Sequence, residues 1–363
     1  MRAAKSALTL AYRRYNCGPP SARTSASHGD WRMGMLRYDA TEWLRAQEGM
    51  PALRARRKLG IERDGDEKAV AALELELSRQ QLRDGSFEES VMKTAGVLNM
   101  LADLGAPGSQ RLGKAASTYL VEALRRQPGY ERAAAVKPGG LTEACDLCGF
   151  FGPYKDRNRP DVLASGAREM NIYREFDALL APKSPVRSAR RSSLDRAGPG
   201  SCFAWGLIPL SFAIEALCRA GYARDAALRP ATNALLGAQR KSGGWCRGDS
   251  GHPSCTIHAI RALGAHPELR KSVHADRALA FLRAAQNGRL GAGFQRWCRG
   301  TYLFAVVEAA SRFELPVARE IIADGLAVLS RSQRKNGSFG KPCEVERVAA
   351  VIAAMHALQA RRG

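Results

Sequence analysis

Apolar positions recur along this chain in a pattern that appears four times. Each copy reads as the end of one amphipathic helix, a polar turn, a Gly-X-aromatic sequence and the start of a second helix. Glycine just beyond a helix adopts the left-handed conformation that side chains resist, so the aromatic residue can fill the gap between neighbouring helix pairs. The four copies cover Leu77–Leu98, Leu235–Gly264, Leu282–Val307 and Leu329–Ile352.

A glutamine stands in the last turn of the first helix in every copy. Its side-chain amide can hydrogen-bond the backbone groups that helix ends leave unpaired. These glutamines are Gln81, Gln239, Gln286 and Gln333. Successive aromatic positions (Trp245, Phe294, Phe339) stand about 45 to 50 residues apart. Two weaker copies fit before them, around Phe150 and Phe203. Two helices in each period predict stacked helical hairpins, because one hairpin cannot bury its apolar face alone.

The apolar spacing also predicts where the helices lie. Tyr38–Leu59 holds an N-terminal pair, with Asp39 or Thr41 as the first cap and Pro51 opening the second helix. Ser109–Arg126 is a further amphipathic helix. The helices expected before the aromatic positions are Ala69–Gln81, Ala223–Gln239, Ala275–Gln286 and Val317–Gln333. Those expected after them are Glu89–Leu104, Leu207–Ala220, Ser254–Leu263, Thr301–Phe313 and Val345–Leu358.

The glutamine and the Gly-(Gly/Ser)-(Phe/Trp) turn resemble the prenyltransferase/squalene-oxidase repeat. That repeat occurs in protein prenyltransferase β subunits and in terpene cyclases of the squalene–hopene type. The resemblance covers roughly Ala69 to the C-terminus and is strong in four units. It implies an all-α fold, an α/α toroid of about six helical hairpins with a short N-terminal helical cap. The helices after each aromatic residue would then be inner, around a central cavity, and those before it outer. An open solenoid of the HEAT type is the alternative.

The chain divides into a leader and one domain. Residues 1–37 are basic and lack a structural period, so we expect a disordered leader. A targeting peptide, or a true start at Met33 or Met35, are the alternatives. Residues 38–363 form the expected toroid domain, in which residues 182–200 are a basic linker insertion that either is disordered or acts as a lid.

Charge and cysteine content indicate which partners and which cellular location to expect for the protein. The net charge of +21 predicts a solvated basic surface or attraction to diphosphates, nucleic acid or lipid head groups. No recognised nucleic-acid motif accompanies that charge. The sequence has no apolar run near the ~20 residues of a transmembrane segment. Nine cysteines at irregular spacing favour reduced thiols and a cytoplasmic location.

In the family that the repeats resemble, the loop after each aromatic residue leads to the rim of the cavity. Residues at these places are therefore candidates to line it. They are Glu88, Glu89, Lys93, Trp205, His258, Trp297, Tyr302, Glu344 and Arg347. Aromatic faces there would stabilise an isoprenoid cation, although at this spacing such residues commonly serve only in packing.

Cysteines near the same rim suggest zinc as a cofactor. Cys255 and His258 are three residues apart on one helical face, and thiolate and imidazole are ligands that zinc prefers. The candidate metal ligands are Cys255, His258, Cys298 and Cys343. The resemblance carries over only Cys255, because Pro253 replaces the family's aspartate and Cys343 stands where its histidine would be. Buried cysteines that only pack between helices are the alternative.

The sequence lacks the Asp-x-Asp-Asp acid of class II cyclases and the DDxxD motif of class I enzymes. The nearest string, Asp64–Glu67, precedes the repeats and is expected to be a solvated turn. The resemblance thus implies a divergent terpene cyclase/prenyltransferase-like toroid that handles an isoprenoid or other apolar ligand. A non-catalytic toroid that binds a lipid, peptide or protein is the first alternative. A basic scaffold on nucleic acid or a membrane surface is the second.

Overall fold

The computed structural model describes residues 36–105, 111–126, 207–245, 253–290, 295, 303–339 and 344–359. In these residues the chain is all-α, as predicted, and the one extended pairing there is an isolated bridge between Phe87 and Ser90. The α-helices are α2 (Thr41–Ala46), α3 (Met50–Leu59), α4 (Asp66–Gln80), α5 (Val91–Asp103), α6 (Arg111–Arg125), α11 (Leu207–Leu217), α12 (Leu228–Gly237), α13 (Pro253–Ala265), α14 (Val273–Gln286), α16 (Leu303–Ser311), α17 (Pro316–Ser332) and α18 (Glu344–Gln359). A π-helical turn, η2 (Cys218–Tyr222), follows α11, and a 3-10 turn, η3 (Leu269–Lys271), precedes α14.

The predicted helices in this part of the chain are present, with their ends shifted by a few residues. The largest shift is at the start of α12, which was expected at Ala223 and begins at Leu228. Gly221 interrupts the chain there with a φ of +93°. Most of the predicted leader, the 182–200 linker and the weaker repeats near Phe150 and Phe203 lie outside the described residues.

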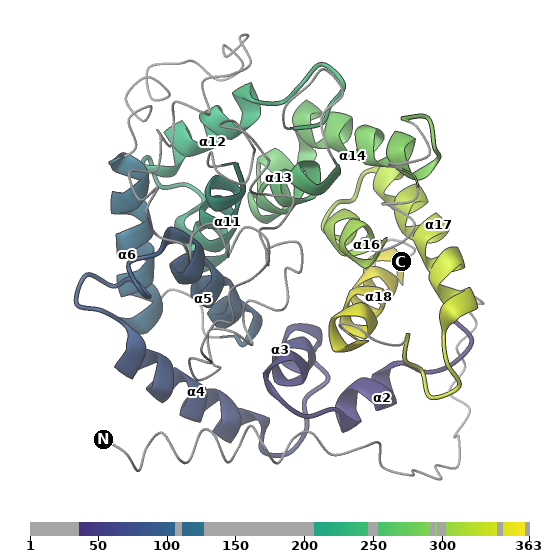
Figure 1. The fold of residues 1–363 in the computed structure, drawn as a ribbon, viewed down its shortest axis with the longest axis horizontal. Coiled ribbons are helices and arrows are strands. Elements are labelled where there is room, and N and C mark those ends of the chain that lie inside the picture. The colour runs from purple at the N-terminus through teal and green to yellow at the C-terminus, as the bar shows by residue number, and fades with distance from the viewer. Residues whose placement is uncertain are drawn as a thin grey trace, which may run out of the picture.

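The helices form a central set and a peripheral set. Figure 1 shows α3, α5, α11, α13, α16 and α18 nearer the centre of the molecule, with α4, α6, α12, α14 and α17 along the outside. Each central helix packs against the next one in this order, α18 packs against α3, and α3 packs against α5. The N-terminal pair therefore does more than cap the first repeat, since α3 stands between the first and the last central helices of the repeats.

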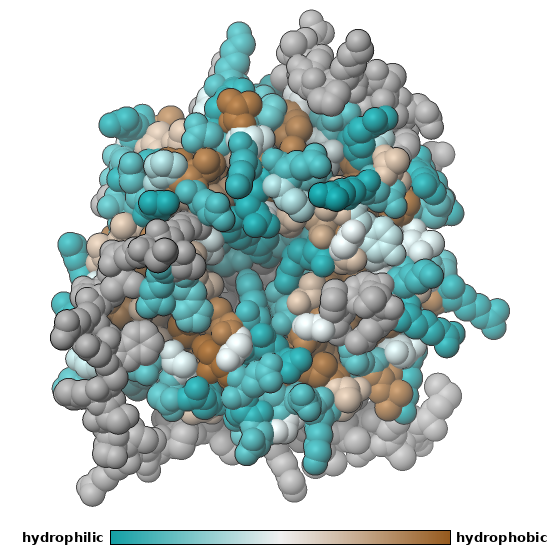
Figure 2. All heavy atoms as spheres, turned by 180° about the vertical axis from the view of Figure 1, so that it is seen from behind, coloured by the Kyte–Doolittle hydropathy of each residue, from teal (hydrophilic) through white to brown (hydrophobic). Residues whose placement is uncertain are grey.

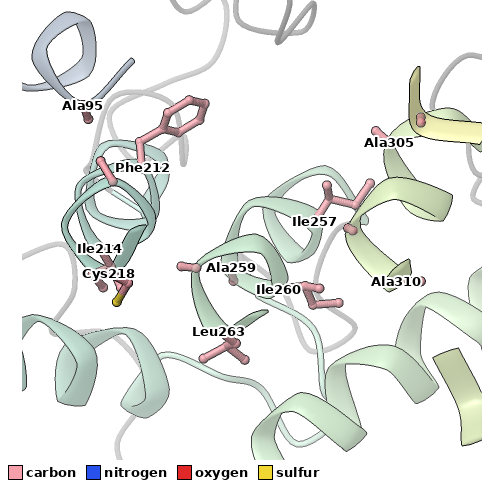
Figure 3. Close-up of a cluster of buried hydrophobic side chains, with 14 of the residues drawn as sticks. Ala95, Phe212, Ile214, Cys218, Ile257, Ala259, Ile260, Leu263, Ala305 and Ala310 are labelled. Carbon is pink, nitrogen blue, oxygen red and sulfur yellow. The ribbon is translucent and has the colours of Figure 1, made fainter. Parts of the chain in front are cut away.

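Small and branched apolar residues fill the spaces between the central helices. Every residue of α11 except Pro209 is buried. Figure 3 shows Ile257 and Ile260 on the side of α13 that faces α16, among alanines that let the helix backbones approach. A Cβ on Gly325 of α17 would lie 2.3 Å from Val307 Cγ2 on α16, so glycine is required for this close packing.

The repeat glutamines connect each turn to the next peripheral helix, as their sequence position predicted. Gln239 Nε2 donates to the carbonyl oxygens of Gly243 and His274, both at 2.9 Å. Gln81 makes the equivalent pair of contacts, with its own turn and with the start of α6. A side chain on Gly243 is excluded, because its Cβ would lie 2.2 Å from the carbonyl oxygen of Arg277 on α14.

The last repeat makes the same contacts with the N-terminal segment. Gln333 Nε2 donates to the carbonyl oxygens of Gly337 at 3.2 Å and Tyr38 at 2.8 Å. Its Oε1 accepts hydrogen bonds from the backbone N–H groups of Arg37 and Tyr38. A Cβ on Gly337 would lie 2.1 Å from the carbonyl oxygen of Asp39. The residues that lead into α2 thus stand where a following peripheral helix stands in the other repeats.

The described repeat aromatics are buried, as expected of residues that fill gaps between helix pairs. Trp245 is fully buried, and its indole Nε1 donates to the carbonyl oxygen of Leu235 at 2.7 Å. Its backbone N–H donates to Thr256 Oγ1 on α13 at 3.1 Å. Phe87 makes the same backbone contact with a threonine of α5. These threonines position each turn against the helix that follows it.

The expectation of a solvated turn at Asp64–Glu67 is wrong for Asp66. This residue opens α4 and is buried, and its carboxylate receives two hydrogen bonds from the Arg56 guanidinium at 2.8 and 2.6 Å. An unpaired buried carboxylate would be costly, so the partner from α3 explains its burial.

Hydrophilic side chains cover much of the face seen in Figure 2, with apolar ones scattered among them. Among the described residues, no helix combines the length and apolar character that a bilayer-spanning segment requires.

Candidate functional site: a buried charge network

Several predicted site residues lie outside the described part of the chain: Trp205, Trp297, Tyr302, Cys298 and Cys343. Glu344 opens α18, and only its backbone is described. The placement of the remaining candidates can be stated residue by residue.

Glu88, Glu89 and Lys93 lie where the first repeat turn enters α5. Both glutamates have left-handed backbone conformations, with φ of 52° and 54°, and both are exposed. The Lys93 ammonium forms an ion pair with Glu88, and these side chains are 39% and 60% exposed. Exposed pairs of this kind contribute little to stability, so these residues form a solvated charged corner at the N-terminus of α5.

Arg347 connects α18 to α16 through an aromatic ring. Its guanidinium carbon lies 4.7 Å from the centre of the Phe304 ring, a cation–π distance. Phe304 also meets Phe339 edge to face, with the ring centres 5.9 Å apart. Arg347, in the last repeat, therefore packs against an aromatic residue of the preceding repeat.

Cys255 and His258 are both buried on α13. Burial raises the pKa of the Cys255 thiol to about 12, so the thiol is protonated at neutral pH. Burial and the nearby Arg261 lower the pKa of His258 to about 3, so its ring is neutral. The described residues hold no group of three or more histidine, cysteine, aspartate or glutamate side chains that could hold a metal ion. The other two candidate ligands of zinc fall outside them.

A cluster of charges with a buried centre was not anticipated from the sequence. Its members come from the C-terminal halves of the central helices and the residues that follow them. They are Arg54 and Lys58 (α3), Asp103 (α5), Glu215 (α11), Arg219 (η2), Arg261 (α13), Glu308 (α16) and Arg312 just beyond α16. Asp103, Glu215, Arg261 and Glu308 are buried, Arg54, Arg219 and Arg312 are half-buried, and Lys58 is exposed. We call this set the buried charge network.

Arg312 joins two carboxylates of the network. Its Nη1 lies 2.7 Å from Glu215 Oε1, and its Nη2 lies 2.8 Å from Glu308 Oε1. Arg261 Nη2 reaches the same Glu215 oxygen at 3.2 Å. Three helices, α11, α13 and α16, are therefore linked by ion pairs.

The rest of the network returns to α3. Asp103 at the end of α5 is held between the guanidinium groups of Arg54 and Arg219. Lys58, one turn after Arg54, places its Nζ 3.2 Å from Glu308 Oε1. Residues 250 positions apart in the sequence thus meet through α3 and α16.

The network shows that these central helices run in the same direction. Its charged groups project from the C-terminal halves of α3, α5, α11, α13 and α16, so these ends converge on one region. Helix C-termini carry partial negative charge, which stabilises nearby cations. The converging ends account for the excess of cationic over anionic side chains in the network.

The carboxyl groups of the network stay ionised. Burial raises the pKa of Glu215, but attraction to Arg261 and Arg312 outweighs burial and lowers that pKa to about 2. The pKa of Glu308 is lowered in the same way, mainly by Arg312 and Lys58 against burial. Arg54 and Arg219 likewise overcome burial and lower the pKa of Asp103. A group ionised at neutral pH cannot donate a proton, so none of these carboxylates is a general acid.

A sequence signal for the network exists in retrospect. Glu215 is the only charged residue in α11, LIPLSFAIEAL, and Glu308 is the only one in α16, LFAVVEAAS. One ionisable residue near the end of an otherwise apolar helix must be buried with that helix and needs a partner. The sequence does not name that partner, because it lies on another repeat.

Comparisons of this chain with protein-family models, with curated proteins and with solved structures find no match.

Proposed function

We propose that this chain is an α/α toroid that holds an apolar, isoprenoid-like ligand among its central helices. The observation that carries the proposal is the buried charge network, since it brings the C-terminal ends of five central helices together. The contacts of α3 with both α5 and α18, and of Gln333 with Tyr38, support closure of the ring. The repeat sequences resemble a family in which such a ring encloses an isoprenoid.

Ligand binding is favoured over class II cyclisation. Alkene protonation needs a carboxylic acid that is protonated at the start of the reaction. Asp103, Glu215 and Glu308 are the buried carboxyl groups of the central helices in the described residues, and the network holds them ionised. The proposed role is therefore to bind and shield the ligand.

A zinc-dependent transfer enzyme is the alternative. Its metal site would draw on Cys255 and His258, which are neutral and buried on α13, together with Cys298 and Cys343. Zinc binding would release the thiol proton, because the thiolate is the ligand.

Metal analysis and mass spectrometry of small molecules retained by the purified full-length chain test these proposals together. We expect a retained apolar molecule, or binding of added isoprenoids, without stoichiometric metal. A protein that retains no apolar molecule and binds no isoprenoid contradicts the proposed function. Stoichiometric zinc that is lost in Cys255→Ala favours the enzyme.

A further inference from the structure

Three side chains among the central helices have a polar atom with no hydrogen-bond partner in the described part of the chain. The atoms are Asn99 Nδ2 on α5, His258 Nδ1 on α13 and Glu308 Oε2 on α16. Each of these residues is more than nine-tenths buried. Burying a polar atom without a partner is costly, so three such atoms point to a partner outside the described residues.

All three atoms adjoin the buried charge network. The backbone oxygen and Oδ1 of Asn99 lie 3.2 and 3.4 Å from Arg219 Nη1. His258 is one turn before Arg261 on α13. Arg261 Nε stands 3.9 Å from Glu308 Oε2, beyond hydrogen-bond reach. The three side chains therefore neighbour or belong to the same network, and they come from three of the central helices.

We propose that these three atoms bind the hydroxyl group of a neutral, apolar ligand such as an isoprenoid alcohol. The hydroxyl oxygen accepts a hydrogen bond from Asn99 Nδ2. The hydroxyl O–H group donates a hydrogen bond to Glu308 Oε2. The hydroxyl oxygen accepts its second hydrogen bond from His258 Nδ1–H. The apolar tail packs against Phe212, whose ring centre is 5.3 Å from that of the imidazole. That the ligand has an apolar tail depends on the proposed function. That its head group is a hydroxyl is inferred from the unpartnered atoms.

The same groups disfavour a diphosphate head. Glu308 is an ionised acceptor, so a phosphoryl oxygen placed against its Oε2 would meet a charge of the same sign. His258 is neutral and offers no positive charge. The cations around Glu308, namely Arg261, Arg312 and Lys58, already form ion pairs with it. A neutral hydroxyl group matches a carboxylate, an amide and an uncharged imidazole in both charge and hydrogen bonding.

The test compares farnesol with farnesyl diphosphate, which share a tail and differ in the head. Binding to the full-length protein is measured by calorimetry and by the shift in Tm. We expect farnesol to bind at least about tenfold more tightly than the diphosphate. His258→Phe keeps an aromatic ring beside Phe212 and removes the polar atom, so farnesol should bind at least about tenfold more weakly.

His274→Phe is the matched control. It also replaces an imidazole, but that imidazole lies on the peripheral helix α14, where it hydrogen-bonds Gln239 Oε1 at 2.6 Å. Farnesol binding should be unchanged in this variant. Equal or tighter binding of the diphosphate to the unmodified protein overturns the inference and leaves the proposed function standing. If neither compound binds, both are overturned.

Discussion

At the scale of single residues, the repeat turns depend on glycines that meet a neighbouring backbone. Gly243 has a φ of +91°, and a Cβ there would lie 2.2 Å from the carbonyl oxygen of Arg277. Gly221 has nearly the same φ, +93°, with nothing within 4 Å of its added Cβ. The two positions therefore separate the effect of backbone conformation from the effect of a steric clash.

We expect Gly243→Ala to be at least about 1 kcal/mol more destabilising than Gly221→Ala, because it adds a clash to a conformational strain that both share. Urea unfolding of both variants measures the difference. Equal losses would mean that the turn does not press against α14.

His258 links stability to pH. Its side chain takes up a proton near pH 6.5 when unfolded and near pH 3 when folded, because burial and Arg261 oppose its charged form. Acid therefore favours the unfolded chain, and the stability that neutral His258 allows is lost as the pH falls from 6.5 toward 3.

We expect His258→Phe to flatten the loss of stability between pH 6.5 and 4.5 by up to about 1.4 kcal/mol per pH unit. Urea unfolding at several pH values checks this. If the variant loses stability with falling pH as steeply as the wild type does, His258 takes up its proton at the same pH in the folded and unfolded states.

At the scale of helices, one buried ion pair fixes how α3 turns into α4. Arg56 and Asp66 have side chains that are 2% and 4% exposed. Hydrogen bonds from the Arg56 guanidinium lower the pKa of Asp66, so the carboxylate is ionised at neutral pH. Removing Arg56 would leave that buried charge with Arg63 alone, whose backbone N–H is 3.2 Å and whose Nε is 3.7 Å from the carboxylate.

We expect Arg56→Met to cost about 3 to 5 kcal/mol of unfolding free energy. Arg56→Met combined with Asp66→Asn should recover part of that loss. Arg45→Met is the control, because Arg45 pairs with Glu42 on the exposed side of α2, and it should have little effect. The three variants can be compared by calorimetry at pH 7.

The N-terminal segment is held to the last repeat by Gln333. Its side-chain amide donates hydrogen bonds to the carbonyl oxygens of Tyr38 and Gly337 and accepts two from the backbone N–H groups of Arg37 and Tyr38. We expect Gln333→Leu to speed hydrogen exchange in Thr41–Ala46 at least about tenfold, since docking of α2 is lost. Gln81→Leu breaks the equivalent contacts of the first repeat and should leave exchange in α2 unchanged.

The sequence was sufficient for the positions of the helices and insufficient for the contacts between residues far apart in the chain. Apolar period, glutamine and glycine identify each repeat locally, which is why the described helices fall where they were expected. The segment before α2 carries no such signature, so its docking on Gln333 could not be read from it. Asp66 was misjudged because its partner, Arg56, sits on a different helix and only the fold brings the two together.

At the scale of the whole molecule, the site is assembled from residues that are distant in the sequence. Glu215 and Arg312 are 97 positions apart, and Lys58 and Glu308 are 250 apart. Local patterns cannot reveal such pairs. The candidate residues read from the repeat turns instead lie near the N-terminal ends of α5, α13 and α18, whereas the buried charge network lies toward the C-terminal ends of the central helices.

Closure of the ring is tested most directly by the coupling between Lys58 and Glu308, whose charged atoms are 3.2 Å apart. A double-mutant cycle with Lys58→Met and Glu308→Gln measures it, and Lys58→Met with Glu320→Gln on the exposed side of α17 is the control cycle. A closed ring predicts a coupling of about 1 kcal/mol in the first cycle and none in the second. A first coupling within about 0.3 kcal/mol of zero would mean that α3 and α16 do not meet, and the ring would be open.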